Sequence, residues 1–392
     1  MALEKMVDIC TKIGSGATPR GGKEAYCDEG ISLVRSQNIL DFTFTCEGLA
    51  HITEEQAKKL DNVELRADDV LLNITGDSVA RVCMMDAEFL PARVNQHVAI
   101  IRGKCDRVLN SYLLYYLQWR KEYLLQLASA GATRNALTKG MIEQLEINLP
   151  TLEHQEKVVS ILNKLQERIK NNRKINNNLE QQAQALFKSW FVDFDPFGGA
   201  CPEEWGKADI YSISRIIYGA PFSSKLFNTE KIGKPIVRIR DLKEQALVTY
   251  TTEIHPKGHL IQAGDIVVGM DGEFRPYLWG NEEAWLNQRV CIFESKEAID
   301  KAFVLFSIKP LLSVIEQTQV ATTVIHIGKK DFDSFEILLP DRRTLNNFGS
   351  ITAPMLNQIV SNRLENKRLA ELRDALLPRL MSGELDVSDI DL

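Results

Sequence analysis

Long apolar runs are missing from this sequence of 392 residues. No stretch reaches the eighteen or so apolar residues of a membrane span, and the first twelve residues include Glu4, Lys5 and Asp8 where a signal peptide would be apolar. The seven cysteines are odd in number, scattered and never arranged as C-x-x-C, which disfavours a disulfide framework or a zinc site. We therefore expect a cytoplasmic protein with reduced thiols, no bound metal and no membrane contact.

Recognisable catalytic motifs are also missing. The glycine-rich segment 14–23 resembles a phosphate loop but has Glu24 where Ser or Thr should hold magnesium, so a loop that approaches DNA, or a plain turn, is the better interpretation. His255 and His259 are four residues apart without a third ligand. Segment 195–197 lacks the second proline of an amino-methyltransferase motif. These absences predict a non-catalytic chain, and the net charge of −6 restricts any DNA-binding face to a local surface.

A heptad seam occurs twice in the sequence. Residues at alternating four- and three-residue steps form the first seam, and the same phase returns 190 positions later. The first seam consists of Val158, Leu162, Leu165, Ile169, Asn172, Asn176, Leu179, Ala183, Leu186 and Trp190. The second consists of Phe348, Thr352, Met355, Ile359, Asn362, Asn366, Leu369, Arg373, Leu376 and Leu380. Two long helices that pack on each other are therefore predicted.

Both seams are interrupted by a pair of asparagines at the same place. If a two-fold axis relates the helices, they run antiparallel, and Asn172 meets Asn366 while Asn176 meets Asn362. Buried asparagines of this kind fix the register of the helices at some cost in stability. Roughly 33 residues at about 1.5 Å each would make a spacer of about 50 Å. Two unrelated amphipathic helices are the simpler alternative.

The segments that precede the two helices repeat each other block by block. Segment 31–39 corresponds to 234–242, segment 69–77 to 265–273, and segment 95–98 to 287–290. The offset between the copies falls from 203 at Val34 and Val237 to 190 at Pro150 and Pro340, which places the insertions in loops. One framework with different loops suggests two sites of one kind that bind different ligands.

Short apolar runs broken by turn residues predict a mixed α and β structure in each copy. In the first copy we expect strands at 31–35, 69–74, 98–102 and 145–149 and one helix at 111–128. The expected fold class is α+β, with two similar mixed α/β domains separated by an antiparallel, pseudo-twofold pair of coiled-coil helices. The expected boundaries are 1–150 for domain 1, 151–194 for the first helix, 195–204 for a linker, 205–340 for domain 2, 341–381 for the second helix and 382–392 for a loosely ordered tail.

The ends of the two helices have recognisable signals. Thr151 and Asp341 each follow a Leu-Pro pair and can accept the free amides of the first helical turn. Pro354 predicts a kink or a late start in the second helix, and Pro378 predicts another bend near its end.

Polar and basic residues near strand ends and loops are the candidates for DNA contact. Arg, Asn and Gln can make paired hydrogen bonds to guanine and adenine edges, although each residue taken singly is more simply a structural one. The candidates are Arg20, Lys23, Arg35, Gln37, Asn38, Arg81, Arg134, Asn135, Lys225, Arg238, Arg240, Arg275, Arg289 and His326. Two shared pairs, Asn95-Gln96 and Asn287-Gln288, either contact bases or hold a turn of the framework.

With these features the chain resembles the DNA-specificity subunits of type I restriction-modification systems over its whole length. The most specific match is the last one, at 372–385. The matching segments are 13–19 (IGSGATP), 69–72 (DVLL), 95–96 (NQ), 149–150 (LP), 153–157 (EHQEK), 188–194 (KSWFVDF), 202–205 (PEEW), 264–266 (GDI), 339–340 (LP) and 372–385 (LRDALLPRLMSGEL).

This resemblance implies two target-recognition domains, each of which reads one half of a split, asymmetric sequence in double-stranded DNA. It also implies that two methyltransferase subunits and motor-nuclease subunits join the chain, and that S-adenosylmethionine, ATP and magnesium bind to those partners and not to this chain. A complex with methyltransferase but no nuclease is the alternative within this class. A free-standing methyltransferase or nuclease, and a scaffold without sequence preference, are the alternatives outside it.

Overall fold

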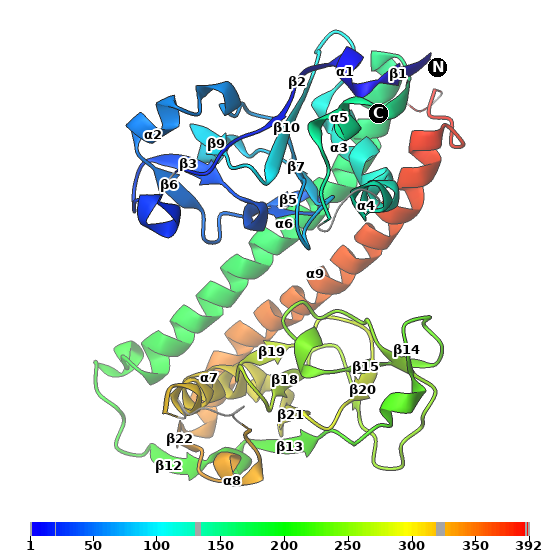
Figure 1. The fold of residues 1–392 in the computed structure, drawn as a ribbon. Coiled ribbons are helices and arrows are strands. Elements are labelled where there is room, and N and C mark those ends of the chain that lie inside the picture. The colour runs from blue at the N-terminus through cyan, green and yellow to red at the C-terminus, as the bar shows by residue number, and fades with distance from the viewer. Residues whose placement is uncertain (1, 20, 130–134, 319–325, 389, 391–392) are drawn as a thin grey trace. The chain divides into compact units, whose positions relative to one another are not determined.

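The computed structural model describes residues 2–19, 21–129, 135–318, 326–388 and 390. Its internal contacts divide the chain into two units. Unit 1 comprises Met1–Glu167 and Ala370–Leu392, and unit 2 comprises Arg168–Leu369. Each unit holds one mixed α/β domain and parts of the two long helices α6 (Leu152–Phe191) and α9 (Arg342–Ser382), which are continuous in Figure 1.

The domain in unit 1 is built around a four-stranded sheet of order β2-β10-β7-β8. Its strands are β2 (Cys10–Ser15), β10 (Val98–Gly103), β7 (Val70–Asn73) and β8 (Val82–Met84). A three-stranded sheet contains β6 (Ala50–Ile52), β3 (Ile31–Val34) and β9 (Ala92–Val94), and two strand pairs are β1 (Ala2–Lys5) with β11 (Glu146–Leu149) and β4 (Ile39–Leu40) with β5 (Thr43–Phe44). The helices are α1 (Met6–Ile9), α2 (Glu54–Lys58), α3 (Asn110–Trp119), α4 (Lys121–Ser129) and α5 (Lys139–Glu143).

The domain in unit 2 repeats this plan, as the sequence predicts. Its four-stranded sheet has the order β13-β21-β18-β19, with β13 (Ser214–Tyr218), β21 (Val290–Ser295), β18 (Ile266–Gly269) and β19 (Pro276–Leu278). The second sheet contains β14 (Phe227–Asn228), β16 (Tyr250–Thr251), β15 (Lys234–Val237), β20 (Ala284–Leu286) and β17 (Leu260–Ile261). The pair β12 (Gly206–Asp209) with β22 (Glu336–Leu339) and the helices α7 (Lys301–Thr318) and α8 (Lys329–Phe332) complete the copy.

The central strand of each four-stranded sheet is buried on both faces. In β7, Val70 and Leu72 pack into the core that includes the helices, while Leu71 packs into the core of the smaller sheet. In β18, Val267 likewise packs on the opposite side from its two neighbours. Because successive side chains of a strand point to opposite faces, a run of apolar residues suits a sheet between two cores. This explains the apolar runs at 70–72 and 98–101 within the predicted strands.

The asparagines of the two seams pair as the sequence predicts. In unit 2, Asn172 Nδ2 donates to Asn366 Oδ1 at 2.9 Å, and Asn362 Nδ2 donates to Asn176 Oδ1 at 2.8 Å. Asn176 Nδ2 also donates to the Ile359 carbonyl at 3.2 Å. The later asparagine of α6 therefore pairs with the earlier asparagine of α9, and the earlier with the later. The two helices are antiparallel in this unit.

The helix parts in unit 1 are antiparallel as well. Arg373 of α9 donates from Nη1 to Gln166 Oε1 of α6 at 2.9 Å, and its guanidinium lies 3.9 Å from the ring centre of Phe42. Lys157, nearer the start of α6, bonds from Nζ to the Ser388 carbonyl beyond the end of α9. The helix pair is thus fixed to the domain of this unit.

Replacing Asn362 with leucine should destabilise unit 2 by about 1–3 kcal/mol, because the buried Asn176 carbonyl oxygen would lose its donor. Replacing both Asn176 and Asn362 with leucine should cost less than the single change, since the buried Asn176 oxygen is removed too, and Gln358, which donates to Asn362, is exposed to water. Urea unfolding of the two variants measures the difference. Asn178→Leu, on the exposed side of α6, is the control, and equal losses in the single and double variants would contradict the pairing.

The helix starts agree with the predicted caps, but the predicted late start of the second helix is wrong. His154 N lies 3.4 Å from Thr151 Oγ1, and Thr344 N donates to Asp341 Oδ1 at 3.0 Å. Helix α9 begins directly after Asp341 and continues through both Pro354 and Pro378. The buried seam residues on either side of Pro354 hold these turns in helical geometry.

Two further predictions need correction. The single helix expected at 111–128 is interrupted at Arg120, where the backbone has ψ near 7°, and the guanidinium stacks 4.3 Å from the ring centre of Tyr123. The tail at 382–392 is not loosely ordered over its described part, because Val387 is fully buried in the core of unit 1. Leu385 packs against the same core, and scattered apolar residues in an acidic segment give too little pattern to predict such packing.

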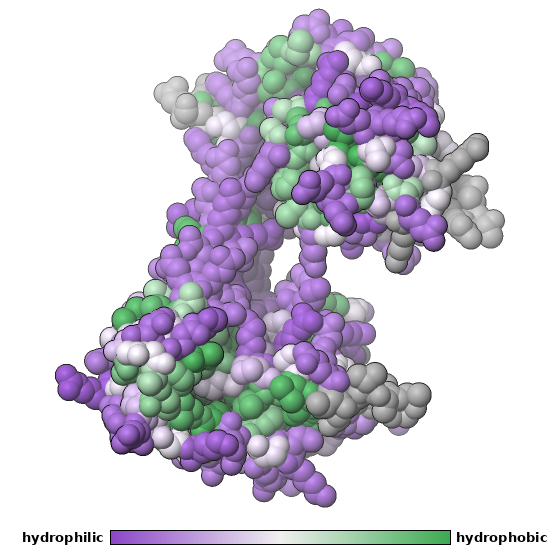
Figure 2. Space-filling view, turned by 90° about the vertical axis from the view of Figure 1, so that its left-hand side faces the viewer, coloured by the Kyte–Doolittle hydropathy of each residue, from purple (hydrophilic) through white to green (hydrophobic). Residues whose placement is uncertain are grey.

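The surface drawn in Figure 2 is predominantly hydrophilic, with apolar residues gathered in patches. Among the described residues, no helix combines the length and the apolar character needed to cross a bilayer.

Candidate nucleic-acid interface

Three backbone hydrogen bonds bring the same loops together in both units. In unit 1 they join the end of β3, the loop after β7, the turn before β10 and the segment before α5. In unit 2 they join the equivalent segments at β15, β18, β21 and α8. In unit 1 they run from Asn95 N to Val34 O (3.1 Å), from Ile74 N to His97 O (3.0 Å) and from Leu137 N to Ile74 O (2.8 Å). In unit 2 they run from Asn287 N to Val237 O (3.3 Å), from Met270 N to Arg289 O (2.9 Å) and from Ile327 N to Met270 O (2.9 Å). Each unit therefore has an equivalent loop cluster.

A glycine lets a fourth loop approach each cluster. A Cβ on Gly16 would lie 1.8 Å from the Val94 carbonyl oxygen, and one on Gly219 would lie 1.9 Å from the Asn287 carbonyl oxygen. No other residue fits at these two positions, since the backbone itself would have to move. Packing thus accounts for one glycine of the segment 14–23.

A chain of side-chain hydrogen bonds crosses the cluster of unit 1. The Thr18 hydroxyl donates to Gln96 Oε1, and Gln96 Nε2 lies 3.2 Å from His97 Nε2. The other ring nitrogen, His97 Nδ1, lies 2.7 Å from Thr75 Oγ1. This surface offers amide and hydroxyl groups.

The cluster of unit 2 carries ionic groups at the equivalent positions. Asp271 replaces Thr75 and Arg289 replaces His97, and the carboxylate of Asp271 lies 2.6 Å from His326 Nδ1 and 3.7 Å from Arg289 Nε. The side chains of Arg240, Arg275, Arg289 and His326 are each more than half exposed. One framework thus presents two different chemical surfaces.

Some predicted candidates hold the loops in place. Asn38 has no exposed surface; its Oδ1 accepts from Arg35 N at 3.1 Å, and its Nδ2 donates to Thr45 O at 3.0 Å. Asp241 has the same capping role in unit 2, where it accepts from Arg238 N at 3.0 Å, and burial raises the pKa of its carboxyl while Arg240 opposes that rise. Asn38 is therefore a correction to the candidate set.

Other candidates differ in how far they extend into solvent. Arg35 and Gln37 both bond the Gly48 carbonyl, and Gln37 is exposed. Asn95 Oδ1 accepts from His97 N and Asn287 Oδ1 accepts from Gln288 N, so both shared asparagines hold a turn.

The remaining candidates fall into three groups. Asn135 is exposed next to the cluster of unit 1, and Arg81 and Arg238 are half-buried. Lys225 is exposed on the 3-10 helix Ser224–Leu226, outside the cluster of unit 2. Arg20 and Arg134, together with the side chain of Lys23, lie outside the described residues.

Sequence reasoning missed Thr18, Thr75, His97 and Asp271. Thr75, His97 and Asp271 could have been found from the internal alignment, since His97 and Arg289 both stand two residues after the shared asparagines and Thr75 and Asp271 both follow the central strand. Nothing in the sequence distinguishes Thr18. Among the described residues, no three His, Cys, Asp or Glu side chains are grouped as a metal site would require.

Comparisons with known proteins give one family. The model of the type I restriction modification DNA specificity domain matches residues 5–181 and 202–373, one match to each copy of the repeat. The MjaIX specificity subunit of a type I restriction enzyme from Methanocaldococcus jannaschii is 25% identical over 421 aligned residues, which cover 99% of this chain and 94% of that one. The HindI specificity subunit from Haemophilus influenzae is 25% identical and covers 84% of this chain and 88% of its own length.

The fold has a solved counterpart. The crystal structure of the S subunit of a type I restriction-modification system from M. genitalium superposes with a TM-score of 0.57 at 13% identity, covering 97% of this chain and 95% of that one. At this identity the likeness concerns the fold alone, and it agrees with two mixed α/β domains joined by long helices. With both copies of the repeat matched by the family model, the chain belongs to the family of type I restriction-modification DNA specificity proteins.

Proposed function

We propose that this chain is the DNA sequence-recognition subunit of a type I restriction-modification complex and reads a bipartite, asymmetric target. Members of the family are non-catalytic components of such complexes, so the chain itself is not an enzyme. The observation that supports two-part recognition is the pair of equivalent loop clusters, held by the same three backbone hydrogen bonds and carrying different side chains. Each cluster would contact one half of the target.

The two surfaces favour different base contacts. Exposed amides in unit 1, at Gln37, Gln96 and Asn135, suit the N6 and N7 edge of adenine. Exposed guanidinium groups in unit 2, at Arg240 and Arg289, suit guanine edges or phosphates. We infer that the half-site bound by unit 2 contributes more of the salt dependence of binding.

The partners belong to the same proposal. Two methyltransferase subunits and motor-nuclease subunits would join this chain on cytoplasmic double-stranded DNA, and S-adenosylmethionine, ATP and magnesium would bind to those partners. A complex that lacks the nuclease would leave the recognition role unchanged.

Methylation mapping tests the function directly. The chain is co-expressed with its neighbouring methyltransferase subunit in a host without other methylation, and methylated positions are mapped across the genome. We expect one split motif with unequal halves separated by a fixed gap. A continuous or palindromic motif, or no methylation by an assembled complex, would contradict the proposal.

Arg240→Ala should weaken binding to the cognate duplex by about 1–3 kcal/mol, because one exposed guanidinium contact is lost. Arg240→Lys separates the two kinds of contact: lysine retains a phosphate contact but not a bidentate guanine contact. Fluorescence anisotropy over a salt series measures both effects. Arg215→Ala, which removes an equally exposed arginine from β13, is the matched control, and an equal loss there would argue against a specific role for Arg240.

A further inference from the structure

One turn of α9 makes two sets of contacts in unit 2. Asn362 and Asn366 bond to α6, as described above. Arg363 and Lys367, which directly follow them in the sequence, point instead toward the loop 278–282 between β19 and β20. The residues that set the register of the helix pair are thus adjacent to residues that hold the recognition domain.

Three polar contacts join this turn of α9 to the loop 278–282. Arg363 Nη1 donates to the Leu278 carbonyl. Lys367 Nζ donates to Asn281 Oδ1 at 3.0 Å and lies 2.9 Å from Glu282 Oε1. We call Arg363 and Lys367, together with the loop 278–282, the clamp. Charged donors give these hydrogen bonds more strength than neutral ones would have.

The loop of the clamp is rigidly fixed within the domain. Gln245 donates from Nε2 to the Leu278 carbonyl at 2.8 Å and accepts from Gly280 N at 2.7 Å. Asn281 Nδ2 donates to the Gln245 carbonyl at 2.7 Å. The Trp279 side chain is fully buried in the core beneath the five-stranded sheet of unit 2. The position of the loop 278–282 is therefore coupled to that of the five-stranded sheet, whose strands β15 and β20 end at the loop cluster of unit 2.

Gly280 allows the clamp to close. A Cβ on Gly280 would lie 2.3 Å from Arg363 Cδ and 2.8 Å from Arg363 Cβ, so the arginine stem lies directly against the glycine backbone. Burial lowers the pKa of the Arg363 guanidinium, which is consistent with this close packing. Any larger residue at this position would push the loop and the helix apart.

The clamp is one of several attachments between α9 and the domain. Nearer the start of the helix, Arg342 Nη1 donates to Asp300 Oδ2 at 2.6 Å, and Phe348 lies in the larger core with apolar residues of α7. Phe348 precedes Arg363 by 15 residues, which is about 22 Å along the helix at about 1.5 Å per residue. A cavity of about 1000 Å³, lined by residues that include Leu305, Arg363 and Lys367, lies beside the clamp. Attachments at separate points along the helix together fix the tilt of the domain on it.

We propose that Arg363 and Lys367 are positioning residues that fix the orientation of the second recognition domain on α9 and thereby set the gap between the two half-sites. This inference rests on the proposed two-part recognition. The adjacent asparagines fix the position of α9 along α6, and the clamp fixes the position of the domain on the same turn of α9. Without the clamp the attachments at Arg342 and Phe348 keep the domain folded and bound to the helix, but the loop 278–282 is no longer held beside the paired asparagines.

The test uses the complete complex with its methyltransferase subunits. Duplexes carry the mapped motif with its natural gap or with one base pair added or removed, and methyl transfer from labelled S-adenosylmethionine is measured. In the double variant Arg363→Met and Lys367→Met, which keeps the side-chain stems, we expect the rate ratio between natural and altered gaps to fall at least tenfold. Both half-site sequences should still be required.

Lys243→Met is the matched control, because Lys243 is a cation in the wall of the same cavity and, within the described part of the chain, forms no hydrogen bond or ion pair with α9. An unchanged ratio in the folded double variant overturns the clamp. If the wild-type complex recognises no split motif, the proposed function itself is contradicted. That result differs from an unchanged ratio in the variant, which contradicts only the role of the clamp.

Gly280→Ala provides a second route that does not depend on the double variant. The added methyl should widen the gap tolerance while Arg363 is present, and combining it with Arg363→Met should add nothing to the effect of Arg363→Met alone. Fully additive effects of the two substitutions would contradict the contact between Gly280 and Arg363. Folding of each variant is checked by circular dichroism before the rates are compared.

Discussion

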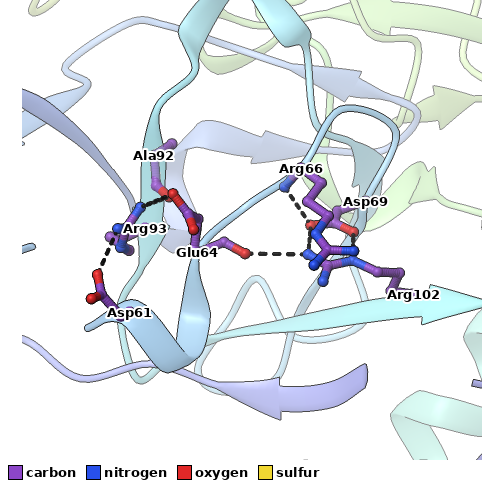
Figure 3. A network of polar contacts seen from close by, with 7 residues as sticks. All are labelled: Asp61, Glu64, Arg66, Asp69, Ala92, Arg93 and Arg102. Atoms are coloured by element: carbon purple, nitrogen blue, oxygen red, sulfur yellow. Dashed lines mark hydrogen bonds and ion pairs between the residues drawn. The ribbon is translucent and has the colours of Figure 1, made fainter. Parts of the chain in front are cut away.

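Asp69→Ala is expected to destabilise unit 1 by about 3–5 kcal/mol, the usual cost of removing one partner of a buried ion pair. The Asp69 side chain is 1% exposed, and its two oxygens accept from Arg102 Nε and Nη2, each at 2.6 Å (Figure 3). Asp69 Oδ2 also accepts from Arg66 N at 2.8 Å. Alanine would leave the Arg66 amide without this acceptor and would leave the largely buried Arg102 guanidinium without its carboxylate partner, with the Glu64 carbonyl at 3.2 Å still bonded to Nη2.

Hydrogen exchange measured by mass spectrometry suits this prediction, because it reports the stability of each unit separately. Peptides from β7 and β10 should exchange faster in the variant, while peptides from unit 2 should not change. Asp265→Asn is the matched control at the equivalent position: Asp265 accepts from Gln262 N at 2.7 Å and forms no ion pair with any described residue. Burial already raises the pKa of Asp265, so a neutral amide should cost little there. Equal losses in the two variants would argue against the ion pair as the cause.

The duplication and the helix pairing could be predicted because both depend on patterns that recur. Asn172 and Asn176 return at Asn362 and Asn366 in the same phase of the same seam, and only one antiparallel register places all four together. The strands at 31–35 and 145–149 were predictable for the same reason, since apolar runs between turn residues depend on local chemistry.

The features that were not predicted depend on contacts between distant segments. The break between α3 and α4 lies at Arg120, whose guanidinium stacks on the ring of Tyr123. The helical spacing of apolar residues in the sequence continues across this break and does not reveal it. Asn38 carries the same side chain as a base-contacting asparagine, and only the loop around it makes it a cap. His97 aligns with Arg289 in the sequence, but its contact with Thr75 joins two separate loops and is visible only in the structure.

The residues that contact DNA are predictable to a smaller extent than the fold. Amide and guanidinium groups indicate which chemistry is possible at each cluster, as at Gln96 and Arg289, but the framework hydrogen bonds are the same in both units. Under the proposed function, the information on the target would reside in the side chains that differ between the two clusters. Mutations such as Arg240→Ala are therefore needed to assign base contacts.

Insertion of one heptad into each helix, at facing positions between the two units, is expected to abolish methylation at the natural gap. Under the proposed spacer role, seven residues lengthen each helix by about 10.5 Å, which equals about three base pairs at 3.4 Å each. The heptad turns the helix by only about 20°, so the asparagine seam can stay in phase. Three base pairs, however, turn the DNA by about 100°, since one turn takes about 10.5 pairs. A target with three added pairs would therefore restore only part of the activity.

The rate of methyl transfer over a series of gaps distinguishes the spacer role from simple damage. We expect at least a hundredfold loss at the natural gap, with any remaining activity moved to longer gaps. Exchanging one heptad for a different sequence with the same seam residues is the control, because it changes the helix surface but not its length, and it should leave the preferred gap where it was. A wild-type rate at the natural gap after insertion would mean that helix length does not set the gap. The recognition domains would then have to find their half-sites independently of the helices, and the paired asparagines would serve stability alone.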